Sequence, residues 1–176
     1  MYSGDEILWF AMGAPYRNEF KVEEMLKSRS IEVYLPRTRK IAVKNGRKTT
    51  CESPAVGNLL FVHSSLNRIN SVKPLIPHLQ FKTFHTQDRN ERIVVPDEQM
   101  QDFIRVSSGE VECRYLSPDE VDIAKGTRVR VIGGGLDGVE GVFMKVKGRR
   151  NRRLVILVEG AVAIETEVSP DLIEVL

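Results

Sequence analysis

Apolar and polar positions alternate in blocks along the first third of the chain. Residues 7–12 (ILWFAM) form a continuous apolar run that ends at Gly13, which is typical of a buried central strand. Residues 31–35 (IEVYL) end at a proline, and residues 58–62 (NLLFV) follow a glycine. Both are short and apolar, so the pattern predicts three core strands.

A helical period separates the first two of these strands. Within residues 17–29, Val22, Met25 and Leu26 recur at helical spacing with charged residues between them. Arg17 and Lys21 lie one turn apart on the opposite face. The segment is therefore predicted to be an amphipathic helix with a solvent-exposed, partly basic face.

A hairpin is predicted between the second and third strands. Asn45-Gly46 is the dipeptide that most favours the type I′ turn of a two-residue hairpin loop, and it joins residues 41–44 to residues 47–50. The surrounding segment carries six bases and no acid, namely Arg37, Arg39, Lys40, Lys44, Arg47 and Lys48. This first basic cluster is therefore predicted to lie on a protruding hairpin.

Periodicity becomes weaker in the middle of the chain. Residues 66–72 predict a short helix and residues 81–86 a strand. Residues 97–106 space their apolar side chains for a second amphipathic helix, with Asp97 as its expected N-cap. The residues that follow show no clear period and contain Ser117-Pro118, so a linker is expected there.

The last third of the chain has the strand period throughout. Residues 125–143 (KGTRVRVIGGGLDGVEGVF) alternate basic and apolar side chains and then supply glycines for tight turns. Residues 154–158 (LVILV) and 162–168 (VAIETEV) are rich in β-branched side chains. These patterns predict a small all-β barrel.

The expected fold is α+β with two domains. Residues 1–109 would form an α/β domain with an antiparallel sheet and flanking helices, residues 110–117 a linker, and residues 118–176 an SH3-like all-β barrel. With 41% hydrophobic content in 176 residues, each part can bury a core.

Charge is distributed unevenly, although the net charge is only +2. A second cluster of six bases without an acid runs from Lys145 to Arg153, and only acids follow it. Such clusters suit a polyphosphate partner, because each base near a phosphate releases a condensed counterion. Solvated hairpin loops explain the same clusters equally well.

Several classes of function find no support in the sequence. Cys51 and Cys113 have no neighbouring cysteine, and the three histidines lack ligand spacing, so no metal, cofactor or disulfide is expected. Glycines 133–135 precede no helix and no G-K-[ST], and no catalytic residues stand out, so an enzyme is the least favoured reading. No apolar run approaches the roughly 20 residues of a membrane span. The N-terminal segment carries acids where a signal peptide carries bases, so a cytoplasmic protein is expected. The protein is also expected to be a monomer.

Two patterns together resemble a known family. Residues 125–143 closely resemble a KOW motif, and the first half resembles the N-terminal domain of NusG-type transcription elongation factors through Trp9-Phe10, RNEFKVEEML, EVYLP, the basic hairpin and PAVGNLLFV. VVPDEQMQDFI at residues 94–104 is most similar to the UpxY-type antiterminators of Bacteroidales capsular polysaccharide operons, relatives of RfaH and LoaP.

The resemblance implies a non-enzymatic factor that binds the clamp helices of RNA polymerase and suppresses pausing or termination. The implied polymerase-binding residues are Val56, Leu59, Ala55 and Met12. This chain departs from the family pattern, because Val56 stands where an aromatic residue is usual and Gly57 where proline is usual. The loss of aromatic area bears directly on the strength of binding.

Nucleic-acid contacts in the elongation complex, to DNA or nascent RNA, are expected from exposed bases on the first domain. These are Arg17, Lys21, Arg39, Lys40, Lys44, Arg47 and Lys48, which would hold phosphates without reading sequence. Base recognition would need stacking aromatics or amides, and the candidates are Tyr16, Asn18, Asn67 and Asn70. A surface or capping role explains each of these residues more readily.

An alternative is a KOW-containing RNA- or ribosome-binding protein that does not bind polymerase directly. Its contacts would come from the loop bases Arg149, Arg150, Arg152 and Arg153. In RfaH the C-terminal domain can also refold into a helical hairpin, but the β-branched segments here favour a barrel in the free protein.

Overall fold

The computed structural model describes residues 2–176 and divides into two units, one ending at Val94 and the other running from Val95 to Leu176. In unit 1 the elements are β1 (Ile7–Gly13), α1 (Glu19–Lys27), β2 (Glu32–Tyr34), β3 (Arg37–Lys44), β4 (Arg47–Pro54), β5 (Leu60–Ser65), α2 (Leu66–Val72), the 3-10 turn η1 (Lys73–Leu75), β6 (Gln80–Phe81), β7 (Thr83–His85) and β8 (Asn90–Arg92). The division falls inside β9 (Val94–Val95).

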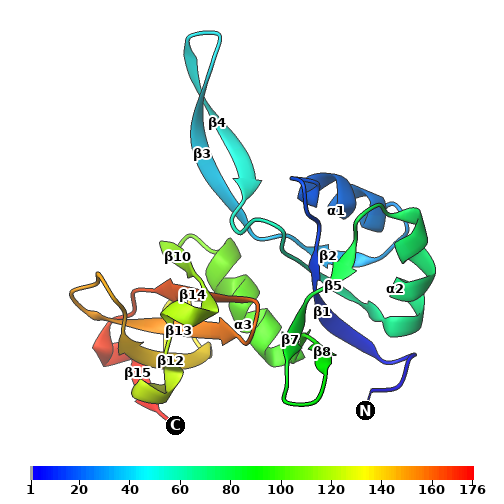
Figure 1. Ribbon diagram of the computed structural model, residues 1–176. Helices are drawn as coiled ribbons and strands as arrows, with labels where there is room; N and C mark the ends of the chain where they lie inside the picture. The colour runs from blue at the N-terminus through cyan, green and yellow to red at the C-terminus, as the bar shows by residue number, and fades with distance from the viewer. Residues whose placement is uncertain (1) are drawn as a thin grey trace. The chain divides into compact units, whose positions relative to one another are not determined.

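The sheet of unit 1 is built around β1. Its order is β2-β5-β1-β6, and β9 also pairs with β1 (Figure 1). Alternate side chains of β1 and β5, including Phe10, Met12 and Leu60, belong to the core cluster that also contains Val22 of α1 and Ile69 of α2. The three core strands and the two helices predicted for this half are therefore confirmed. The strand expected at residues 81–86 is divided between β6 and β7.

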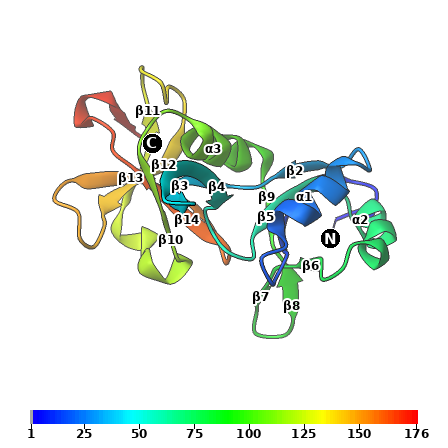
Figure 2. The same cartoon turned by 90° about the horizontal axis from the view of Figure 1, so that it is seen from above.

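Two hairpins of unit 1 lie outside this sheet. Figure 1 shows β3–β4 as a long hairpin, which Figure 2 views almost end-on, and both views show β7–β8 as a shorter hairpin. Asn45 and Gly46 have φ of 52° and 75°, which a type I′ turn requires. The predicted hairpin and its turn are confirmed.

The first helix begins later than its periodicity suggested. Tyr16 and Arg17 have φ of 63° and 60°, which excludes them from a right-handed helix, and α1 starts at Glu19. The prediction that Arg17 and Lys21 share one helical face is therefore wrong, although both side chains are exposed.

Unit 2 combines one helix with a six-stranded antiparallel sheet of order β10-β14-β13-β12-β11-β15. Its elements are α3 (Asp97–Ser108), β10 (Cys113–Leu116), η2 (Pro118–Glu120), η3 (Ile123–Lys125), β11 (Thr127–Val131), β12 (Glu140–Lys145), β13 (Arg152–Val158), β14 (Val162–Thr166), η4 (Pro170–Leu172) and β15 (Ile173–Val175). Gly141 on β12 is required by close approach, because an added Cβ would lie 2.7 Å from the Val155 carbonyl oxygen on β13.

Helix α3 lies against this sheet. The Gln99 amide donates to the Leu157 carbonyl at 2.6 Å, and the Glu140 N–H donates to the Asp102 carboxylate at 3.1 Å. Burial raises the pKa of that carboxyl above its ordinary value. The N-cap position is Pro96 rather than the expected Asp97, which lies in the first turn.

This arrangement differs from the expected division at residue 109. Helix α3 is grouped with the sheet of unit 2, and β10 lies inside the expected linker at residues 110–117. Residues 113–116 lack a clear period, yet they form a strand because each pairs with a residue of β14. Cross-strand pairing, which local spacing does not reveal, determines this element.

Candidate functional site

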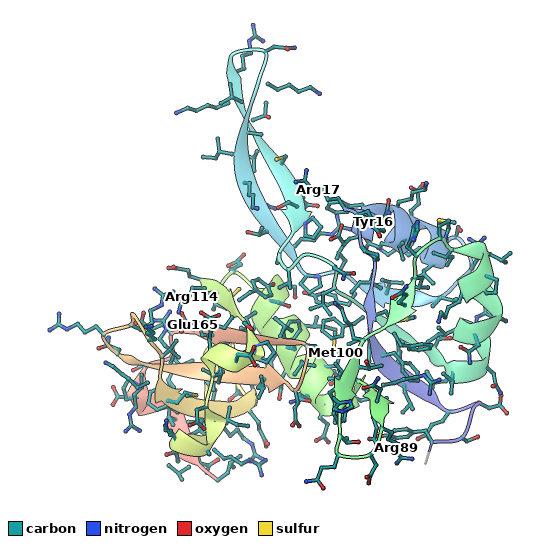
Figure 3. The ribbon with its side chains drawn as sticks, in the orientation of Figure 1. Tyr16, Arg17, Arg89, Met100, Arg114 and Glu165 are labelled. Carbon is teal, nitrogen blue, oxygen red and sulfur yellow. The ribbon has the colours of Figure 1, made fainter. Side chains whose placement is uncertain are left out.

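The hairpin β3–β4 carries the largest set of exposed bases on unit 1. Arg39, Lys40, Lys44, Arg47 and Lys48 are all exposed, and within residues 2–176 none of them forms an ion pair. Figure 3 shows side chains spreading from both sides of the hairpin, which extends away from the sheet of its unit. The structure therefore brings five of the seven expected nucleic-acid-binding residues together.

The strand register gives this hairpin two different faces. Directly paired residues share a face of a hairpin, and so does every second residue along each strand. Lys40, Lys44 and Arg47 therefore lie on one face, together with the small side chains of Ala42 and Thr49. We call this the basic face, and its remaining members are Thr38, Cys51 and Ser53.

The opposite face is mixed. Ile41 and Val43 are 75% and 69% exposed there, beside Lys48 and Arg39. We call this the mixed face. A sequence run that lists six bases does not distinguish the two faces, because the distinction depends on the register of β4.

The base of the hairpin is held by an ion-pair network that ties it to α1. Arg37 donates to the buried Glu23 carboxylate at 2.5 Å and to Glu52 at 2.8 Å, and its guanidinium lies 5.0 Å from the Phe20 ring. The hydrogen bond to Glu52 is the largest contribution that raises the pKa of Arg37 above its ordinary value, so the group stays charged. Arg37 therefore anchors the hairpin.

The residues expected to contact polymerase are divided by burial. Met12 and Leu59 are 0% and 2% exposed, so neither offers its side chain to a partner in this structure. Ala55 and Val56 are half-buried in the turn between β4 and β5. That turn is fixed by Asn58, whose N–H donates to the buried Glu19 carboxylate at 2.8 Å. Ala55 and Val56 are the two members of this set with accessible surface.

The basic loop of unit 2 is also divided. Glu165 of β14 is 0% exposed and receives Arg149 at 2.6 Å and Arg114 at 2.9 Å, with Arg153 at 4.0 Å. Arg153 is itself buried and bonds Glu167 at 2.5 Å. Figure 3 labels Arg114 beside Glu165. Two of the four expected loop contacts, Arg149 and Arg153, therefore have internal partners.

The two remaining loop bases face solvent. Arg150 and Arg152 are exposed and line a hollow of about 750 Å³ together with Lys145, Asn151 and Glu167. The sequence feature that marks this internal arginine cluster is an acid, Glu165, within the β-branched segment VAIETEV at residues 162–168. Spacing alone did not show that Glu165 points inward.

Two kinds of feature are absent from the described residues. Within residues 2–176 no group of three or more His, Cys, Asp or Glu side chains is placed to hold a metal ion. In the same range no helix has the length and apolar character needed to cross a membrane. Cys51 and Cys113 are free thiols, and burial raises the pKa of Cys113.

Comparison with models of protein families identifies the family of this chain. The family model described as transcription termination factor NusG matches residues 8–104, more than half of the chain. The chain therefore belongs to the NusG family, whose members are non-enzymatic factors of transcription elongation and termination.

A solved structure titled "Domain interaction in Thermotoga maritima NusG" aligns with 97% of this chain and 93% of its own, at 19% identity and a TM-score of 0.42. No curated protein matches the chain.

Proposed function

We propose that this protein is a specialised antitermination factor that binds the clamp helices of RNA polymerase through unit 1 and suppresses pausing or termination. Membership of the NusG family carries the proposal. The resemblance of residues 94–104 to UpxY-type factors supports a role at long surface-polysaccharide operons.

The polymerase contact is assigned to the turn that contains Ala55 and Val56. Both are apolar and partly accessible, and they lie where β5 begins, close to the Met12 end of β1, because Met12 pairs with Leu60. A helical partner needs such an apolar patch. The patch is small, so the neighbouring hairpin bases would add affinity through nucleic acid in the elongation complex.

Unit 2 is proposed to be the KOW domain, a small barrel that serves as a second binding surface. The exposed pair Arg150 and Arg152 and their hollow support a phosphate-bearing or acidic partner there. If that surface supplied the principal activity, the protein would be an RNA- or ribosome-binding factor without polymerase contact, which is the second candidate function.

The test is co-purification of the full chain with RNA polymerase after Val56→Asp. A charge buried at the contact is expected to reduce association at least tenfold. The matched control is Ile7→Asp, because Ile7 is 53% exposed and pairs with Ser65 at the opposite end of the β1–β5 ladder. Association unchanged by Val56→Asp removes the proposed surface. Binding of structured RNA without polymerase binding favours the second candidate.

A further inference from the structure

The mixed face of the hairpin β3–β4 carries an unusually exposed apolar surface. Among the leucine, isoleucine and valine side chains of residues 2–176, Ile41 and Val43 are the most exposed, at 75% and 69%. They lie two residues apart on one strand, so they project on the same side, roughly 7 Å from each other. Thr50 pairs with Ile41 and Lys48 with Val43, and the methyl group of Thr50 and the alkyl stem of Lys48 extend the surface across β4. We call these four residues the apolar ridge.

Positive charge borders the apolar ridge, and no acid is free beside it. Arg39 precedes Ile41 on the same face, and Lys48 supplies a second charge within the ridge. Among residues 37–54, all of which the structure describes, the one acid on this face is Glu52, and it accepts a hydrogen bond from Arg37 at 2.8 Å. The charges therefore fit a partner whose apolar side chains are bordered by carboxylates, and they oppose a second copy of the same ridge.

The base of the hairpin is fixed within unit 1, so the ridge is presented in an ordered state. The Ala55 N–H donates to the Pro36 carbonyl at 2.8 Å, directly below the first pair of the ladder. Arg37 bonds the buried Glu23 carboxylate of α1. Strands β3 and β4 pair only with each other, and Figure 1 shows the hairpin projecting from the sheet of its unit. A partner therefore has little conformational freedom to remove when it binds.

A single α-helix matches the ridge in width and in spacing. Neighbouring strands lie about 5 Å apart, so a two-stranded ribbon with its side chains is about as wide as one helix of about 10 Å diameter. Helical side chains four residues apart are separated by about 6 Å along the axis, close to the separation of Ile41 and Val43. A strand added along the edge of the hairpin would leave the ridge uncovered, because these side chains stand perpendicular to the sheet.

The ridge is separate from the surfaces that the proposed function uses. Thr50 precedes Ala55 by five residues of extended chain, or about 17 Å, so the ridge lies well away from the turn assigned to polymerase. Phosphate contacts suit the basic face, where lysines stand among hydroxyl side chains such as that of Thr49. The exposed aliphatic groups on the other face gain free energy only when they are removed from water.

We infer that the apolar ridge docks an acidic amphipathic helix of another protein. Two apolar side chains of that helix, one turn apart, cover Ile41 and Val43, and its flanking carboxylates meet Arg39 and Lys48. This interaction goes beyond the proposed function, since it requires neither polymerase nor nucleic acid. It gives the hairpin a protein-binding face opposite its basic face.

The experiment measures fluorescence anisotropy of a labelled helical peptide with the full chain. The peptide carries leucines four residues apart with glutamates beside them, and a second peptide keeps the leucines but has lysine for each glutamate. The acidic peptide is expected to bind at least about tenfold more tightly than the basic one. Ile41→Thr with Val43→Thr keeps every charge and is expected to weaken binding of the acidic peptide roughly tenfold, with unfolding in urea showing that the variant is folded.

Ala42→Thr is the matched control, because Ala42 is adjacent in sequence but lies on the basic face. It should bind the acidic peptide like the wild type, and so should Val56→Asp, which separates the ridge from the polymerase contact. Equal binding of the two peptides, or equal effects of the double variant and Ala42→Thr, overturns the inference. So does loss of peptide binding in Val56→Asp, which would place the peptide on the polymerase turn.

Other occupants of the ridge are tested with the same double variant. Binding of oligonucleotides and of anionic phospholipid vesicles, and self-association by sedimentation, are measured for the wild type and for Ile41→Thr with Val43→Thr. If the variant keeps peptide binding but loses one of these three, the ridge serves nucleic acid, a lipid surface or a second copy, and the inference is wrong. Unchanged values for all three, with peptide binding lost, support it.

Discussion

Two adjacent residues of unit 1 adopt a backbone conformation that their side chains disfavour. Tyr16 and Arg17 both have φ near 60°, a region where Cβ crowds the following carbonyl. The conformation ends β1, turns the chain and delays the start of α1 to Glu19. Glycine adopts this conformation without such crowding, so each of the two side chains adds strain to the turn.

This strain leads to a prediction about stability at position 16. Tyr16→Gly relieves the left-handed conformation, whereas Tyr16→Ala retains it and loses the same ring. The glycine variant is therefore expected to be more stable than the alanine variant by about 1 kcal/mol, measured by urea unfolding. If the alanine variant is the more stable of the two, the strain at this position has been overestimated.

Glu165 is the residue on which the internal cluster of unit 2 depends. It is fully buried and faces Arg114, Arg149 and Arg153. Glu165→Gln keeps the shape but removes the buried negative charge that faces the three arginines, so the free energy of unfolding should fall by roughly 3 kcal/mol. The measurement is chemical unfolding of the full chain.

Glu167→Gln is the control for that change. Glu167 also bonds Arg153, and that bond lowers its pKa, but its side chain is exposed. Water can replace an exposed carboxylate as a partner, so the effect should be clearly smaller. Equal losses from the two variants would show that burial of Glu165 does not determine its contribution.

At the scale of elements, the hairpin β3–β4 separates charge from apolar surface through its register. Lys40, Lys44 and Arg47 share the basic face, while Ile41 and Val43 lie on the mixed face. Replacing the three bases of the basic face by Gln should weaken binding of single-stranded nucleic acid. The slope of the logarithm of the binding constant against the logarithm of the salt concentration should also become shallower by about 2. The reason is that binding releases fewer condensed counterions when three phosphate contacts are lost.

The control for the basic face changes the mixed face instead. Ile41→Thr with Val43→Thr retains strand-forming side chains and leaves every base in place. The salt slope should then remain that of the wild type. A slope that falls equally in both variants would mean that the whole hairpin, rather than one face, engages the strand.

Elements with a strong period could be predicted from the sequence, and elements defined by pairing could not. Residues 7–12 and 97–106 carry enough apolar side chains at one spacing to specify a strand and a helix. The turn at Asn45-Gly46 follows from its own φ preferences. Strand β10 could not be predicted, because only its ladder with β14 specifies it.

The candidate site was predictable in part for the same reason. Exposed bases on the hairpin follow from composition and turn chemistry, and five of them are placed as expected. Burial of Met12 and Leu59 and the inward direction of Glu165 depend on neighbours far away in sequence. A hollow of about 300 Å³ in unit 1 is lined by residues 13, 15 and 16, by Asn58 and by residues 78 and 80–82, which no local pattern connects.

At the scale of the whole molecule, the family match and the structural units have different boundaries. The match continues to residue 104, within α3, whereas the units divide between Val94 and Val95. Most of helix α3 therefore lies in the region matched by the family model, whereas its contacts group it with unit 2. Three contacts of α3 have their partners in unit 2. Gln99 donates a hydrogen bond to Leu157, Asp102 accepts one from Glu140, and the ring centroids of Phe103 and Tyr115 lie 6.4 Å apart.

These contacts predict how fragments of the chain will behave. A fragment of residues 95–176 retains α3, whereas a fragment of residues 110–176 lacks it. The longer fragment should be more stable to unfolding by at least about 2 kcal/mol, because it retains two hydrogen bonds to buried or partly buried groups and a ring contact. Chemical unfolding of both fragments provides the comparison. The double change Gln99→Ala with Asp102→Ala in the longer fragment tests the cause, because it should remove most of the difference. Equal stability of the two fragments would show that α3 does not support the sheet, and the boundary expected at residue 109 would then describe the protein better.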